Sequence, residues 1–168
     1  ARSRVHEYGG GVYCVCEHGI FFVNDADQAV YRLEDGSKPQ RITDIENVRF
    51  ADLCFDSRRN RILCVCEDHN NSRAEPVNSL VSIDVTTGII STLHQGYDFY
   101  SNPRINHDGS KLAWLCWNHP NMPWDGTELW LLGGLVIGGS TLTVAYTVRF
   151  LIGVFGPGPA VEVAPPRP

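Results

Sequence analysis

A repeat within the chain is the feature that most restricts its fold. The tetrapeptide CVCE occurs at residues 14–17 and again at residues 64–67, an interval of 50 residues. At the same interval, residues 31–34 (YRLE) correspond to residues 81–84 (VSID), and both are apolar/polar alternations that end in an acid. Self-similarity with a period of 20–50 residues is typical of proteins built from stacked, similar units. We therefore expect each unit to be one supersecondary element that packs on its neighbours.

A third copy of the unit follows the second at the same spacing. Cys66 and His69 correspond to Cys116 and His119 in the next copy. If the three copies are in register, Cys16 belongs to the same series as Cys66 and Cys116. The sequence thus predicts that these three thiols occupy one structural position, seen three times.

Each copy contains short apolar runs separated by polar turns. In the second copy the runs are residues 52–55, 61–66, 79–84 and 89–93, and in the third they are residues 103–105, 111–117 and 127–131. The Asp108-Gly109 pair between two runs is typical of a hairpin turn, because Gly adopts positive φ without strain. Four short strands per 40–50 residues are typical of a β-propeller blade. We predict an all-β fold, a β-propeller fragment of about three four-stranded blades with a period of 50 residues, over residues 1–131.

The paired cysteines could also bind a metal, act in redox chemistry or form disulfides. Cys14 and Cys16 lie two apart in an apolar run, so on a strand they point to the same face and are poorly placed to bond each other. Zinc sites more often use Cys-x-x-Cys spacing with a turn between the ligands. Cys is also among the most often buried residue types. We expect buried free thiols, and neither a metal nor another cofactor.

Composition and charge exclude several functional classes. The chain has 168 residues, of which 43% are hydrophobic and 20% charged, and its formal net charge is −5, so it suits a globular domain better than a nucleic-acid-binding protein. Its 14 Lys and Arg residues are scattered and form no basic stripe. The first residues, ARSRVHE, contain neither an initiator Met nor an apolar signal. We expect a segment cut from a longer cytoplasmic chain.

Several stretches together resemble a known family. They are residues 6–11 (HEYGGG), 26–28 (ADQ) with 31–33 (YRL), 67–69 (EDH), 98–104 (DFYSNPR) and 119–130 (HPNMPWDGTELW). They are similar to the N-terminal β-propeller of the prolyl oligopeptidase family of serine peptidases, in its acylaminoacyl-peptidase and dipeptidyl-aminopeptidase branch. The resemblance implies a propeller that gates access to an α/β-hydrolase domain, whose Ser, Asp and His cleave short peptides. That domain and a short peptide substrate are the partners it implies.

Two features of the chain depart from this family pattern. A nucleophile elbow requires Gly-x-Ser-x-Gly before a helix, and the nearest match, residues 138–142 (GGSTL), lacks the closing Gly. We therefore assign no catalytic residue to this chain. Residues 132–168 form a Gly/Pro-rich apolar tail without a match in the family, and the uncharged run 129–148 is long enough to span a membrane but poor in helix formers. We do not expect a membrane span there; extra strands, a membrane segment or a frame-change product are the alternatives.

Within the longest matching stretch, four residues are candidates for contact with substrate: His119, Trp124, Asp125 and Glu128. Trp124 offers an aromatic face, and either carboxylate could meet the amino terminus of a peptide. The competing interpretation is structural, with Trp124 filling a gap between blades and Glu128 on the solvent face of a strand.

Two other functional classes remain open from the sequence. A stand-alone kelch-like binding module has a similar period and glycine doublets, but residues 9–11 (GGG) have no counterpart at residues 53–55 (LCF). A zinc or redox protein would use the Cys-x-Cys pairs. Thiol titration and metal analysis would distinguish this class from the other two.

Overall fold

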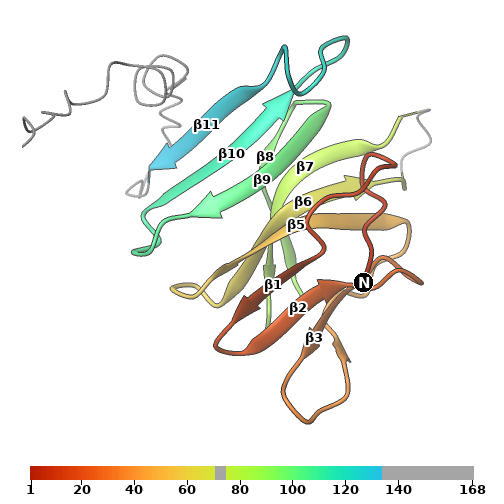
Figure 1. Ribbon diagram of the computed structural model, residues 1–168, viewed down its shortest axis with the longest axis vertical. Helices are drawn as coiled ribbons and strands as arrows, with labels where there is room; N and C mark the ends of the chain where they lie inside the picture. Colours follow the sequence, from red (N-terminus) through yellow and green to blue (C-terminus); the bar gives the residue numbers. More distant parts are fainter. Residues whose placement is uncertain (71–74, 134–168) are drawn as a thin grey trace, which may run out of the picture.

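The computed structural model describes residues 1–70 and 75–133, which fold into three antiparallel sheets without an α-helix (Figure 1). The first sheet contains β1 (Tyr13–Cys16), β2 (Gly19–Val23), β3 (Val30–Leu33) and β4 (Gln40–Arg41). The second contains β5 (Val48–Asp56), β6 (Arg61–Asp68), β7 (Val77–Asp84) and β8 (Ile90–Gln95). The third contains β9 (Phe99–Ile105), β10 (Lys111–Trp117) and β11 (Glu128–Gly133). The all-β fold of about three propeller blades, predicted from the repeat, is confirmed.

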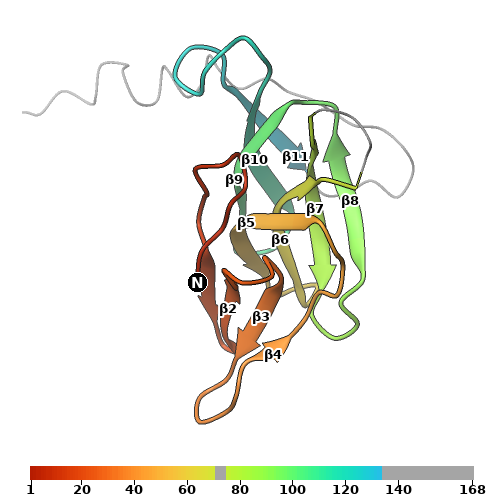
Figure 2. The same ribbon diagram turned by 90° about the vertical axis from the view of Figure 1, so that its right-hand side faces the viewer.

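In every sheet the strands follow one another in chain order, so each sheet is a meander. The second sheet lies between the other two, as Figures 1 and 2 show. Its strand β6 alternates between two hydrophobic clusters. Ile62, Cys64 and Cys66 pack toward the first sheet, whereas Leu63 and Val65 pack toward the third. A continuous apolar strand is therefore required here, because both of its faces are covered by a neighbouring sheet.

The second and third sheets repeat in register at the interval seen in the sequence. Phe50 pairs with Cys66 as Tyr100 pairs with Cys116, so these two thiols occupy equivalent places on the second strand of their sheets. Cys16 does not belong to this series, which corrects the sequence-based prediction. It lies on β1, the first strand of its sheet, and pairs with Gly19 across the β1–β2 turn.

Shorter strands and shorter connections cause this shift in the first sheet. Val15 pairs with Ile20 as Phe55 pairs with Ile62, so β1 corresponds to β5 and β2 to β6, both at intervals shorter than the sequence repeat. Ile20 on β2 pairs with Leu33 on β3, and the equivalent residue Ile62 on β6 pairs with Ile83 on β7. Leu33 and Ile83 are therefore equivalent, and only β3 precedes its counterpart by the full repeat of the sequence. The recurring CVCE letters thus lie on different strands, the first copy on a first strand and the second copy on a second strand.

All six cysteines are unbonded, as predicted for each Cys-x-Cys pair. Cys64, Cys66 and Cys116 are buried, and burial raises the pKa of Cys66 and of Cys116 to about 12. Such thiols remain protonated at neutral pH and pack as small hydrophobic side chains.

One carboxylate joins β5 to the segment that leads into β1 and to β9. Asp52 lies in a bulge of β5 with a φ of 57°. Its Oδ1 accepts a hydrogen bond from the Gly11 backbone N–H (2.5 Å), and its Oδ2 accepts one from the Asn102 N–H (2.9 Å). A Cβ at Gly10 would meet Asp52 Oδ1 at 2.8 Å. The glycines of residues 9–11 therefore permit close approach of the N-terminal segment to β5.

Strand β11 continues to Gly133, and residues 134–168 of the sequence-predicted tail lie outside the described residues. So does most of the uncharged run considered as a membrane span. Within the part of the chain that the structure describes, no helix is long and apolar enough to cross a membrane.

Candidate functional site

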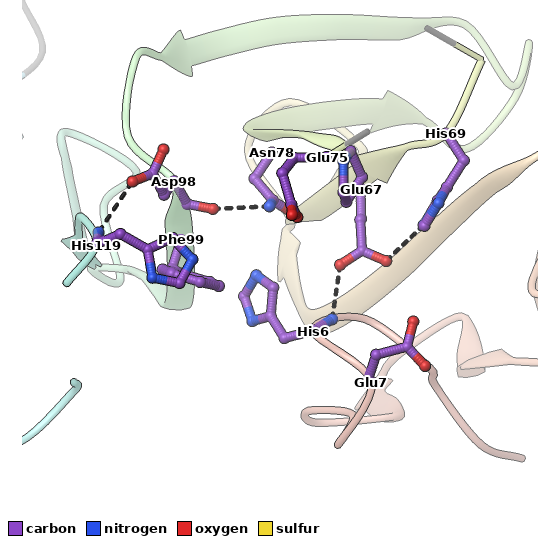
Figure 3. A pocket seen from close by; sticks show the side chains of 10 residues that line it. His6, Glu7, Glu67, His69, Glu75, Asn78, Asp98, Phe99 and His119 are labelled. Carbon is purple, nitrogen blue, oxygen red and sulfur yellow. Dashed lines mark hydrogen bonds and ion pairs between the residues drawn. The ribbon is translucent and has the colours of Figure 1, made fainter. Parts of the chain in front are cut away.

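Four separate segments surround a cavity of about 370 Å³. They are the N-terminal segment before β1, the end of β6 with residue 69 and residues 75–76 with β7, the start of β9, and the β10–β11 loop. The residues that line the cavity are His6, Glu7, Glu67, His69, Glu75, Pro76, Asn78, Asp98, Phe99 and His119. Figure 3 shows the His6 ring between Glu67 on one side and Phe99 with His119 on the other.

Glu67 is the anchor of the wall formed by β6. Its side chain is only 3% exposed, and three polar groups contact its two carboxylate oxygens. The backbone N–H of His6 donates to its Oε2 (2.6 Å), while His69 Nε2 (2.7 Å) and an Arg49 guanidinium nitrogen (3.2 Å) contact its Oε1. Arg49 also bonds Glu7 at 2.6 Å and lowers the pKa of that carboxyl. A buried carboxylate with this many partners is held in one position.

His6 is placed in the cavity by an unusual backbone. His6 and Glu7 both have positive φ values, 53° and 64°, and the hydrogen bond to Glu67 holds this turn in place. The His6 ring contacts Phe99 edge-on, with centroids 5.1 Å apart. Burial lowers the pKa of His6 from 6.5, although Glu67 and the nearby Asn78 oppose that shift. The imidazole is therefore neutral at pH 7.

The opposite wall is built around Asp98. Its backbone carbonyl accepts a hydrogen bond from Asn78 Nδ2 (2.7 Å), and its carboxylate accepts one from the His119 backbone N–H (2.9 Å). The His119 ring lies against Phe99, with centroids 4.8 Å apart. Asp98 thus fixes both β7 and the β10–β11 loop at the edge of the cavity.

The cavity carries a surplus of negative charge. Four carboxylates line it, from Glu7, Glu67, Glu75 and Asp98, and Arg49 balances part of this charge at one side. Such a site favours a cationic group and disfavours an anion. Among the described residues, no group of three or more His, Cys, Asp or Glu side chains has the arrangement needed to hold a metal ion.

The structure brings one of the four predicted contact residues, His119, into the cavity. Trp124 is 78% exposed on the β10–β11 loop. Asp125 accepts a hydrogen bond from the Met122 backbone N–H (2.6 Å) within that loop. Glu128 lies elsewhere, where it accepts hydrogen bonds from the Tyr97 hydroxyl (2.7 Å) and Trp130 Nε1 (2.9 Å).

Sequence reasoning did not select most of the residues that form the cavity. The sequence nevertheless contained a signal for them, because four of the family-like stretches each contribute at least one residue to the cavity. HEYGGG contributes His6, EDH contributes Glu67 and His69, DFYSNPR contributes Asp98 and Phe99, and HPNMPWDGTELW contributes His119. Stretches that are far apart in the sequence and resemble one family converge on a single site. Their convergence, rather than any single stretch, identifies the site.

Comparison with solved structures gives close matches. A Mycobacterium tuberculosis puromycin-hydrolyzing peptidase superposes with a TM-score of 0.76 and 34% identity, covering 88% of this chain. A puromycin hydrolase matches with a TM-score of 0.72 and 25% identity, and its mutant complexed with PGG with 0.73 and 25%, each over 86% of this chain. No family model and no curated protein sequence matches the chain.

The chain spans about a quarter of each of these proteins, since the alignments cover 25% of their length. The likeness therefore concerns one part of a larger architecture. That part is all-β, as the three sheets here are. Fold and sequence stretches agree that this chain is a partial N-terminal β-propeller of the prolyl oligopeptidase family of serine peptidases.

Proposed function

We propose that this chain is part of the substrate-gating propeller of a peptidase that cleaves short peptides. The catalytic Ser, Asp and His would come from an α/β-hydrolase domain outside the described residues. The observation that carries the proposal is the convergence of four family-like stretches on one acidic cavity. The solved structures that match are a puromycin-hydrolyzing peptidase and a puromycin hydrolase, which supports a peptidase-related function.

Between the two activities of this branch of the family, we favour cleavage of peptides with a free amino terminus, as in the dipeptidyl-aminopeptidases. An acylaminoacyl-peptidase accepts a blocked and uncharged amino end, which gains nothing from a cavity with four carboxylates. A free amino end is cationic at neutral pH and is attracted to such a cavity. The unbonded state of all six thiols fits our proposal of a cytoplasmic location, because disulfides are rare in reducing compartments.

The proposal is tested with the full-length protein and three substrate types: dipeptide 4-nitroanilides with free amino ends, their N-acetyl counterparts, and puromycin. We expect the free-amino substrates to be cleaved with the highest kcat/KM. A serine-directed phosphonate should abolish turnover and label a Ser outside residues 1–70 and 75–133. The isolated chain of 168 residues should show no turnover.

Two outcomes would contradict this function. One is a full-length protein that cleaves none of the three substrate types. The other is a phosphonate label on a Ser among the described residues, since that would place the chemistry in the propeller itself.

A further inference from the structure

The turn that carries His6 and Glu7 to the cavity has a conformation that neither residue adopts readily on its own. Both residues lie in the left-handed region, with φ values of 53° and 64°. A non-glycine residue is strained there because its Cβ approaches the backbone, so two in succession persist only when the surrounding structure holds them. Both side chains line the cavity. Whatever holds this turn therefore also sets the shape of the site.

Hydrogen bonds within the N-terminal segment close the turn but do not place it. The Glu7 N–H donates to the Arg4 carbonyl (3.0 Å). The Gly9 N–H donates to the Val5 carbonyl (2.8 Å). Both bonds join residues of the same segment, so they leave its position relative to the second sheet undefined. That position depends on contacts with β5 and β6.

Arg49 on β5 supplies most of these contacts. One of its nitrogens, Nη1, lies within hydrogen-bond distance of the Arg4 carbonyl oxygen (2.8 Å), Glu7 Oε1 (2.6 Å) and Glu67 Oε1 (3.2 Å). Arg49 and Glu67 are also register partners across β5 and β6. Glu67 in turn accepts the His6 N–H at 2.6 Å (Figure 3). The guanidinium thus touches the turn before and after His6, and its partner Glu67 binds His6 itself.

The two carboxylates that contact Arg49 differ in their surroundings. The Glu7 side chain is 81% exposed, and ion pairs of exposed groups add little to the free energy of unfolding. The Glu67 side chain is 3% exposed and belongs to the packed second sheet. Arg49 therefore links an exposed side chain to a buried and fixed one. Such a link determines where Glu7 lies more than it stabilises the fold.

We infer that Arg49 is a positioning residue for substrate binding, which holds the turn of His6 and Glu7 against the second sheet and so keeps both side chains at the cavity. Arg49 does not itself line the cavity, so it acts through these two residues. Its part in substrate binding rests on the proposed function. Its part in holding the turn is independent of that function.

Kinetics of the full-length protein test the part in binding, with a free-amino dipeptide 4-nitroanilide as substrate. Arg49→Met removes the charge and every donor, and we expect KM to rise about tenfold while kcat changes less than about twofold, the pattern of a loss in binding. Arg49→Lys restores a charged donor group, so its KM should lie closer to that of the unaltered protein.

Arg32→Met is the matched control for these variants. The Arg32 side chain is 24% exposed, as is that of Arg49, and it also pairs with a carboxylate, that of Glu34. It lies on β3 and does not line the cavity, so Arg32→Met should leave KM unchanged. Equal KM values for Arg49→Met and Arg32→Met would overturn the inference.

Hydrogen exchange measured by mass spectrometry tests the turn without a substrate. The peptide that contains residues 6–9 should exchange about tenfold faster in Arg49→Met, while peptides from β6 should exchange as before. Glu7→Gln weakens one contact at an exposed position, so it keeps the test available if Arg49→Met fails to fold, and it should accelerate the same peptide about threefold. Unchanged exchange of residues 6–9 in a variant that folds, or equal acceleration in β6, would overturn the inference.

Failure of this role and failure of the proposed function give different results. If the full-length protein cleaves peptides while Arg49→Met leaves KM and the exchange of residues 6–9 unchanged, the function stands and the role of Arg49 is wrong. If the protein cleaves no peptide but residues 6–9 exchange faster in Arg49→Met, the function is wrong and Arg49 still holds the turn.

Discussion

Removal of the Asp52 carboxylate should loosen all three sheets at once. Asp52→Gly keeps the positive φ of 57° accessible but deletes the acceptors of the Gly11 and Asn102 N–H groups. Hydrogen bonds to a charged group contribute about 1.5–3 kcal/mol each, and the lower value applies because both of these bonds are exposed to solvent. We therefore expect Asp52→Gly to lower the free energy of unfolding by about 3 kcal/mol.

Two further substitutions at Asp52 separate the causes. Asp52→Asn tolerates positive φ and keeps one acceptor oxygen, so it should cost about half as much, roughly 1.5 kcal/mol. Asp52→Ala loses both bonds and adds the strain of a left-handed Ala, roughly 1 kcal/mol more than Gly. The predicted order of stability is Asp, Asn, Gly, Ala.

Urea unfolding of the full-length protein, monitored by tryptophan fluorescence, measures this order. Hydrogen exchange by mass spectrometry provides the local check, because peptides that contain Gly11 and Asn102 should exchange about tenfold faster in Asp52→Gly for each ~1.4 kcal/mol lost locally. Equal stability of the Asn and Gly variants, or normal exchange at both sites, would refute the role assigned to Asp52.

Three other predictions concern the thiols, pH and association. Iodoacetamide at pH 8 should alkylate Cys66 and Cys116 only after unfolding, because burial raises the pKa of each thiol to about 12. Rapid labelling of either thiol in the folded protein would contradict their burial. Burial lowers the pKa of His6 and of His94 in the folded protein, so as the pH falls below 6.5 the unfolded chain binds protons first and the fold loses stability. We expect a lower Tm at pH 5.5 than at pH 7.5, with a smaller difference in His94→Gln and an unchanged difference in the exposed control His107→Gln. Residues 1–133 alone should self-associate, because Tyr13 and Val15 are 62% and 67% exposed on the face of β1 away from the core. The double substitution Tyr13→Ser with Val15→Thr should reduce this association. Sedimentation of the unaltered fragment as a compact monomer would show that this face needs no cover.

The sequence predicted where the strands lie better than it predicted which strands are equivalent in successive sheets. Apolar/polar alternation and turn residues located β5 to β11, because strand period and turn chemistry are local properties. The correspondence of Cys16 with Cys66 was wrong, because a first strand and a second strand can carry the same four letters. Only the pairing of Val15 with Ile20 and of Phe55 with Ile62 reveals which strand is which. Pairing is a long-range property that one sequence does not contain.

The candidate site was predicted in part for a related reason. His119 was selected within a long family-like stretch, and it lines the cavity. Glu67, Asn78 and Asp98 gain their significance from contacts across sheets, such as the bond from the His6 N–H to Glu67, which joins the N-terminal segment to β6. No local pattern marks such a residue. Trp124 was predicted to contact substrate because of its aromatic face, yet its side chain is largely exposed to solvent.

The unequal connections described above bear on how this architecture can diversify. Compared with the first sheet, the second has a first turn and a link from its second to its third strand that are each two residues longer, and its second and third strands are also longer, while the order of pairing is the same in both sheets. The longer link, β6–β7, carries His69 and Glu75 to the cavity. Backbone can thus be inserted or exchanged there without disturbing the packed strands, so ligand selectivity could be re-engineered by loop grafting on an unchanged scaffold.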